Sequence, residues 1–98
     1  MGRTIKSQSK HDACVRAEAN SYIARGYEVW ADIAGYPKPM SIGGYIPDII
    51  ASISGHTTVV EVETPDSVGT ARDIKQRAAF KKWTNYSDKR HYRLLIAD

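Results

Sequence analysis

Three acidic side chains lie within two neighbouring apolar segments of the sequence. Asp48 follows Pro47 at the start of the first segment, and Glu61 and Glu63 alternate with valines in the second. A carboxylate inside an apolar strand is costly to bury unless a cation or a hydrogen-bond donor compensates its charge. Hard cations such as Mg²⁺ bind one or two carboxylates together with water and phosphate oxygens. The three acids therefore predict a divalent-cation site, provided that the fold brings them together.

The dipeptide Ser54-Gly55 separates the two segments and is typical of a tight hairpin turn. A two-residue loop at this point pairs Ile53 with His56 and places Asp48 opposite Glu61. Directly opposed residues share a face of the sheet, with Cβ atoms about 4.5–5.5 Å apart. Like charges in such a pair destabilise the sheet, and a cation bound between them reverses the sign of this effect.

Both faces of the predicted hairpin are apolar. Beside the acids, one face carries Ile46, Ile50 and Val59, and the opposite face carries Ile49, Ala51, Ile53, Val60 and Val62. A strand pair that is apolar on both faces is typical of the centre of a sheet covered by other elements. The alternative interpretation, in which the alternating acids form an ordinary solvated face, remains open at this point.

Composition limits the class of protein. The chain has 98 residues, a formal net charge of +3 and 42% hydrophobic residues, which favours one globular domain over residues 1–98. The polar residues 1–8 are expected to be flexible. No apolar run reaches the length of a membrane span, and no signal-peptide core follows Met1. Cys14 is the single cysteine, which excludes an internal disulfide and favours a cytoplasmic location.

The remaining elements follow from periodicity and capping residues. A first helix is expected from Lys10 to Arg25, with Ser9 as its N-cap and Gly26 as its stop. A strand over residues 27–33 and a loop over residues 35–45 precede the hairpin at 45–63. A second helix, starting at Ser67 or Ala71 with a cap pair formed by Thr70 and Asp73, ends near Tyr86. A last strand covers residues 91–97.

This order is α-β-β-β-α-β. Because a helix separates the third and fourth strands, these two strands should be parallel and the sheet mixed. The expected fold class is thus α/β (α+β) with a central four-stranded mixed sheet flanked by two helices.

The element order, with Pro-Asp followed after twelve residues by Glu-Val-Glu, resembles the PD-(D/E)xK nuclease superfamily, whose fold is called restriction-endonuclease-like. Small archaeal Holliday-junction-resolvase-like members are the most similar, and the resemblance covers residues 10–97. It implies that Asp48 and Glu61 hold a catalytic Mg²⁺ or Mn²⁺ ion. Glu63 stands where the family usually has lysine; there it would accept a proton from water or help to hold a second ion.

The resemblance also implies two residues on the helices. Glu18 looks like the acid of the first helix that many members place near the metal, and Gln76 matches the glutamine of resolvase-like members. An exposed helical acid beside Arg16 or Arg25, and a glutamine bonded to backbone, are the alternatives.

Basic side chains mark the candidate nucleic-acid surface, because Lys and Arg contact phosphates without reading sequence. The second helix supplies Arg72, Lys75 and Lys82, and the glycine- and proline-rich loop over residues 35–45 supplies Lys38. A merely solubilising helix face would have the same composition. The three histidines, His11, His56 and His91, show no zinc-ligand spacing with Cys14.

These observations favour metal-dependent phosphodiester hydrolysis of DNA by an endonuclease that is structure-selective or resolvase-like. Its expected partners are DNA and a second copy in a homodimer, without a membrane. The alternative is a catalytically inactive nuclease-fold module that binds nucleic acid or a protein partner. A third hypothesis is a small α/β protein whose acids pair with Arg or Lys.

Overall fold

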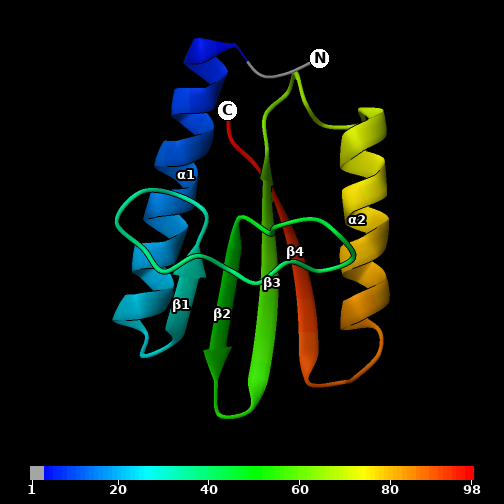
Figure 1. The fold of residues 1–98 in the computed structure, drawn as a ribbon. Coiled ribbons are helices and arrows are strands. Elements are labelled where there is room, and N and C mark those ends of the chain that lie inside the picture. The colour runs from blue at the N-terminus through cyan, green and yellow to red at the C-terminus, as the bar shows by residue number, and fades with distance from the viewer. Residues whose placement is uncertain (1–3) are drawn as a thin grey trace.

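Six elements follow one another in the predicted order in the computed structural model, which describes residues 4–98 (Figure 1). They are α1 (Ile5–Ala24), β1 (Glu28–Ala31), β2 (Ile49–Ile53), β3 (His56–Glu63), α2 (Ala71–Thr84) and β4 (Arg90–Ile96). The four strands form one mixed sheet in the order β1-β2-β3-β4, in which only the pair β3 and β4 is parallel. The predicted fold class is confirmed.

Helix α1 begins earlier than predicted. Its N-cap is Thr4, whose hydroxyl accepts a hydrogen bond of 3.1 Å from the Ser7 amide, so the prediction of Ser9 as the N-cap was wrong. Residues 5–8, which were expected to be flexible, form the first turns; the rest of that expectation concerns residues 1–3, outside the described part. Ile5 is 91% exposed, so the first turn lacks the buried apolar stripe on which the predicted start of the helix depended. Gly26, with φ +89°, ends the helix as predicted.

The hairpin of β2 and β3 has the predicted register. Ile53 pairs with His56 and Ile49 with Val60. Ser54 and Gly55 both have positive φ, 50° and 81°, as the two central residues of a type I′ hairpin turn do. Continuing this register by one residue places Asp48 opposite Glu61.

Helix α2 makes the crossover between the parallel strands. Thr70 is its N-cap and accepts a hydrogen bond of 3.3 Å from the Asp73 amide, while the Asp73 carboxylate accepts one of 2.6 Å from the Gly69 amide. The hydrogen bond from the Asp73 amide to the Thr70 hydroxyl is the predicted cap pair, and the Asp73 carboxylate caps the preceding amide as well.

The two helices cover opposite faces of the sheet. Residues of α1 pack with one face, in a cluster that includes Val15, Ala19, Val29, Ile49, Val60 and Val62. Residues of α2 pack with the other face, in a cluster that includes Ile50, Val59 and Phe80 with the half-buried Trp30 and Trp83. The assignment of residues to faces is therefore as predicted, and β2 and β3 are central strands. Within residues 4–98, neither helix has the length and apolar character needed to cross a membrane.

The connection between β1 and β2 crosses the α2 face of the sheet (Figure 1). It packs against α2 at Gly43, where a Cβ would lie 2.9 Å from the Cβ of Ala79. Gly43 also has φ +61°, so both backbone conformation and close approach require glycine there. This contact fixes the end of the loop that leads into Pro47 and Asp48.

Candidate functional site

A cleft of about 590 Å³ opens where β3 ends and both helices begin. Six carboxylates of the described residues line it, against the guanidinium of Arg72 and the imidazole of His11. The acidic residues are Asp12, Asp32, Asp48, Glu61, Glu63 and Asp73. Three of the four residues predicted to be catalytic are therefore carboxylates of one cleft, and the fourth, Gln76, also lines it.

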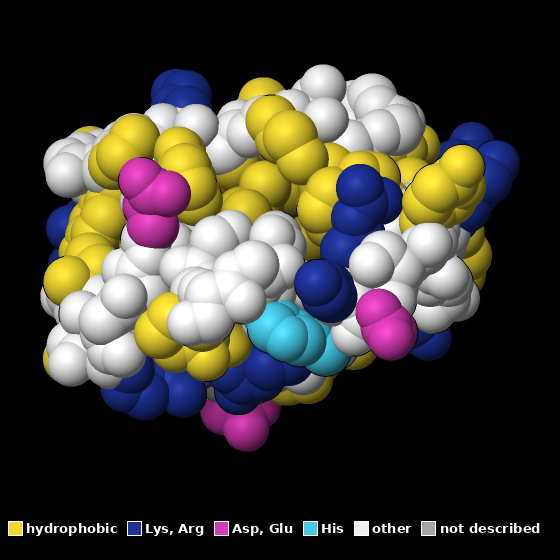
Figure 2. Space-filling model, turned by 90° about the horizontal axis from the view of Figure 1, so that it is seen from below, with side chains coloured by type: hydrophobic (Ala, Val, Ile, Leu, Met, Phe, Trp, Pro, Cys, Tyr) yellow, Lys and Arg dark blue, Asp and Glu magenta, His cyan; other side chains and the backbone are white. Residues whose placement is uncertain are grey.

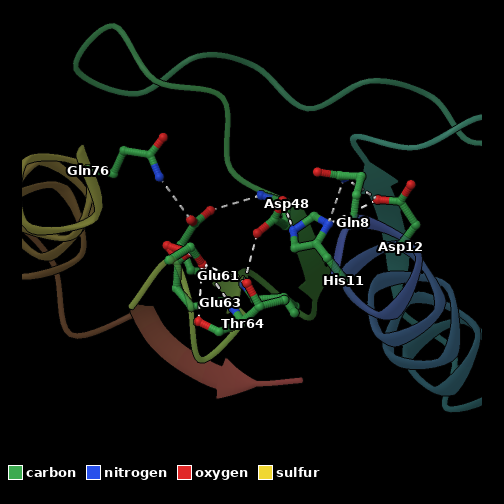
Figure 3. Close-up of polar contacts among 10 residues, drawn as sticks. Gln8, His11, Asp12, Asp48, Glu61, Glu63, Thr64 and Gln76 are labelled. Carbon is green, nitrogen blue, oxygen red and sulfur yellow. Dashed lines mark hydrogen bonds and ion pairs between the residues drawn. The ribbon is translucent and has the colours of Figure 1, made fainter. Parts of the chain in front are cut away.

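Asp48 and Glu61 interlock across the two central strands. The Asp48 amide donates a hydrogen bond of 3.0 Å to Glu61 Oε1, and the Val62 amide donates one of 2.8 Å to Asp48 Oδ2. The Glu61 residue is 4% exposed. Each side chain is thus bonded to the other strand's backbone, which fixes both carboxylates at the bottom of the cleft (Figure 3).

Gln76 reaches Glu61 from helix α2. Its Nε2 lies 3.2 Å from Glu61 Oε2 and donates a hydrogen bond to it. In Figure 3 the glutamine extends from the helix towards the acid. The contact joins two residues that the sequence placed in the same site.

Glu63 lies at the end of β3 and is 3% exposed. The hydroxyl of Ser67 donates a hydrogen bond of 3.1 Å to its Oε2. Ser67 belongs to the turn that leads from β3 to α2, so this turn holds the third acid against the cleft.

His11 is the site residue that the sequence reasoning missed. Its Nε2 lies 3.0 Å from Asp48 Oδ1, and its Nδ1 lies 2.9 Å from Asp12 Oδ1 (Figure 3). Gln8 Nε2 donates a further hydrogen bond of 2.9 Å to the same oxygen of Asp12. A neutral imidazole donates through one nitrogen only, whereas an imidazolium donates to both carboxylates.

One sequence signal could have placed His11 in the interior. It stands four residues before Val15, so it extends the buried stripe of α1 by one turn. The histidine is 5% exposed. Its contact with Asp48 spans 37 residues of sequence, so no local pattern could have shown it.

Glu18 lies outside this cleft. Its carboxylate is 3.5 Å from the guanidinium of Arg93 on β4, and together with Tyr22 and Arg25 it lines a separate shallow groove. The structure therefore does not bring Glu18 to Asp48 and Glu61 as a ligand at the cleft.

The predicted nucleic-acid-binding residues occupy the rim of the cleft and the exposed face of α2. Arg72 lines the cleft, and Lys38 forms an ion pair of 2.9 Å with Asp32 of its wall. Lys75 and Lys82 are exposed on α2 and are not part of the lining. Two of these four cations, Arg72 and Lys38, therefore lie at the cleft, and the other two lie further along α2.

The residues present fit a hard divalent cation in part. Every carboxylate oxygen of Asp48 and Glu61 has at least one polar contact with a protein group. Among residues 4–98 there is no group of three or more His, Cys, Asp or Glu side chains arranged to hold a metal. An ion held by the two acids would therefore complete its shell with water or phosphate oxygens, as Mg²⁺ commonly does.

The carboxylates of the cleft also affect the pKa of Tyr92 on β4. Burial and the nearby Glu61 carboxylate raise the pKa of the Tyr92 phenol to about 12, partly opposed by Arg77. The Tyr92 hydroxyl is buried without a hydrogen-bond partner in the described part of the chain. On the α1 side, burial and the charges of Glu18 and Asp48 raise the pKa of the Cys14 thiol.

Comparisons with family models, with curated proteins and with solved structures found nothing that matches this chain.

Proposed function

We propose that this chain is a metal-dependent endonuclease of the PD-(D/E)xK type that hydrolyses phosphodiester bonds of DNA. The observation that carries the proposal is the interlocked pair of Asp48 and Glu61 at the bottom of an acidic cleft. The element order and the antiparallel and parallel pairings of the sheet support the same conclusion.

Asp48 and Glu61 would hold Mg²⁺ or Mn²⁺. When bound, such an ion polarises the phosphate and lowers the pKa of a water molecule. His11 and Gln76 act on the two ligands, since His11 contacts one oxygen of Asp48 and Gln76 donates to one oxygen of Glu61. These contacts orient the carboxylates before substrate binds, which lowers the cost of assembling the site.

Glu63 would accept a proton from the attacking water in the position where the family usually has lysine. Its carboxylate is buried in the same cleft and receives a hydrogen bond from Ser67. A general base must lie within hydrogen-bond reach of the proton it removes, and Glu63 is the acid next to Glu61 on the same face of β3.

The cations around the cleft would contact the DNA backbone. Arg72 and Lys38 lie at the rim, and Lys75 and Lys82 continue along the exposed face of α2. Phosphate contacts give affinity without sequence reading. Because a chain of 98 residues has little surface left for base recognition, cleavage selective for DNA structure by a homodimer fits better than cleavage at a defined sequence.

The cytoplasm is the compartment that we propose, on the basis of the single cysteine. The pKa of Cys14 is raised, so its thiol stays protonated and unreactive.

Incubation of the purified protein with branched and linear DNA, in the presence of Mg²⁺ or Mn²⁺, tests the proposal. We expect cleavage that is lost in the Asp48→Ala and Glu61→Ala variants. Asp88→Ala removes an exposed acid outside the cleft and serves as the matched control, which should cleave like the parent chain. Absence of cleavage from every DNA substrate with either ion would reject the enzyme.

The second candidate is a nuclease-fold module that binds nucleic acid or a protein partner and does not cut. The observation that favours it is the presence of Glu63, instead of lysine, next to two carboxylates whose oxygens already have contacts with protein groups. DNA binding that persists in the Asp48→Ala variant, without cleavage by the parent chain, would support this candidate.

A further inference from the structure

Two histidines lie side by side at the end of the sheet opposite the cleft. His56 is the first residue of β3, directly after the hairpin turn, and His91 is the second residue of β4. His56 Nδ1 is 3.1 Å from His91 Nε2. Both side chains are exposed, and Figure 2, which views the molecule from this end, shows histidine side chains open to solvent beside Lys and Arg side chains.

The ring nitrogens of the pair face each other. The two rings are inclined by only 15°, and their centroids are 5.3 Å apart. The centroid separation is close to the sum of the distance between the two nitrogens and the two distances from each nitrogen to its own ring centre. The two nitrogens therefore lie between the rings, nearly on the line that joins the ring centres, and point directly at each other.

The backbone holds the pair in place. His91 is paired with Thr58 in the parallel ladder of β3 and β4, and His56 lies two residues before Thr58 on the same strand. The two imidazoles therefore share one face of the sheet as diagonal neighbours. The turn at Ser54 and Gly55 pins the start of β3, because Ile53 and His56 are paired across it.

We propose that His56 and His91 form a two-histidine binding site for a divalent transition-metal ion such as Cu²⁺ or Zn²⁺. Imidazole is a good ligand for both ions. With Zn–N bonds of about 2.0–2.1 Å, two nitrogens of a tetrahedral site are separated by about 3.3 Å, which is close to the present separation of 3.1 Å. To bind the ion, each exposed ring turns by roughly 35°, so that its lone pair points at the ion instead of at the other nitrogen. Water, or a donor group of another molecule, completes the coordination shell on the exposed side.

Binding needs no net loss of protons from the neutral rings. In the contact of 3.1 Å one ring donates its N–H to the lone pair of the other. When the ion binds, the donating ring moves its proton to its remote nitrogen, and both facing nitrogens become ligands. The ion therefore replaces one N–H···N hydrogen bond with two coordinate bonds.

This site is chemically distinct from the cleft. The cleft offers carboxylate oxygens, which suit Mg²⁺ and Mn²⁺, whereas the histidine pair offers two nitrogens, which suit ions later in the transition series. The proposal is therefore independent of the proposed nuclease activity.

Calorimetric titration of the untagged chain with CuCl₂ or ZnCl₂ tests the site. We expect one ion per chain at this site, with Cu²⁺ bound more tightly than Zn²⁺. His56→Ala and His91→Ala should each weaken the affinity about 10-fold or more, as loss of one of two protein ligands requires. Both side chains are exposed, so the two variants should keep the fold, which circular dichroism verifies.

Two matched variants separate this site from the cleft. His11→Gln removes the third imidazole, and the double variant Asp48→Ala/Glu61→Ala removes the cleft's acid pair; both should bind the ion at the histidine pair as the parent chain does. In a titration with Zn²⁺, the NMR signals of the His56 and His91 rings should shift at lower ion concentrations than those of the His11 ring. Binding that is unchanged in His56→Ala and His91→Ala, or that disappears with the cleft acids, would overturn the proposal.

Discussion

The two ends of strand β3 carry polar groups in opposite environments. At its last residues Glu61 and Glu63 are nearly buried and are held by hydrogen bonds from Gln76, Ser67 and the Asp48 amide. At its first residue His56 is exposed and contacts one other histidine. Strand β3 therefore carries buried, hydrogen-bonded carboxylates at its last residues and a solvent-exposed histidine of the pair at its first residue.

The difference follows from where the helices begin. Both α1 and α2 start at the cleft end of the sheet (Figure 1). A helix N-terminus carries partial positive charge, which stabilises nearby carboxylates and phosphates. The first residues of the helices also cover the acids, so burial and partner groups come together at this end. Neither α1 nor α2 begins near the hairpin turn, and a polar side chain there needs no protein partner because water solvates it.

The largest effect is expected for activity at the cleft end. Glu61→Gln keeps the shape of the side chain but removes its charge, and we expect DNA cleavage to fall about 100- to 1,000-fold, the scale of losing one electrostatic group of an active site. His56→Ala, at the other end of the same strand, should leave cleavage unchanged. Initial rates in Mg²⁺ measure both, and equal losses in the two variants would contradict the separation of the two ends.

The next effect concerns two glycines with positive φ. Gly43→Ala should lower the free energy of unfolding by about 2–4 kcal/mol, because strain of the left-handed conformation adds to overpacking against Ala79. Gly55→Ala in the hairpin turn should cost only about 1–2 kcal/mol, since its Cβ would meet nothing within 4 Å. Urea denaturation measures both.

A double variant checks the cause of the Gly43 effect. Ala79→Gly removes the atom that the new Cβ of Gly43→Ala would meet. The two substitutions together should therefore destabilise by less than the sum of the separate effects. Additive losses would show that the close approach is not the reason.

A third comparison sets a buried histidine against an exposed one. His11→Ala should lower the free energy of unfolding by about 1–3 kcal/mol, because it removes a buried partner of Asp48 and Asp12. His56→Ala should change it by about 0.5 kcal/mol or less. Thermal or urea unfolding at neutral pH distinguishes them, and a similar loss in both would refute the partner role of His11.

The last effect, which is seen only at alkaline pH, is the response of Tyr92. Its pKa is raised from 10.0 to about 12, so the folded state keeps the phenol proton that the unfolded state loses near pH 10. This contribution to stability is present below pH 10 and is lost as the pH rises towards 12. The stability of the parent chain should therefore fall more steeply than that of Tyr92→Phe between pH 10 and 12. Identical slopes would contradict the raised pKa.

Much of the fold could be predicted from the sequence because its signals are local. The turn at Ser54 and Gly55 sets the register of β2 and β3, and a register error of one residue would turn every apolar side chain to the wrong face. The cap pair of Thr70 and Asp73 fixed the start of α2 in the same way.

The parts that were missed depend on contacts between distant residues. The pairing of Asp48 with Glu61 was predictable because both acids belong to one hairpin. The pairing of His11 with Asp48 depends on how α1 is rotated against the sheet, and no pattern within either segment specifies that angle. The same rotation directs Glu18 towards Arg93, away from the acids with which the family resemblance had grouped it.

The positions at which α1 starts and β4 ends also bear on how the molecule can be handled. Both lie at the cleft end of the sheet (Figure 1). A tag or fusion partner attached through either would emerge beside the carboxylates and crowd the entrance. A fluorophore or surface anchor attached to α2 near Asn85, at the other end, would leave the entrance open.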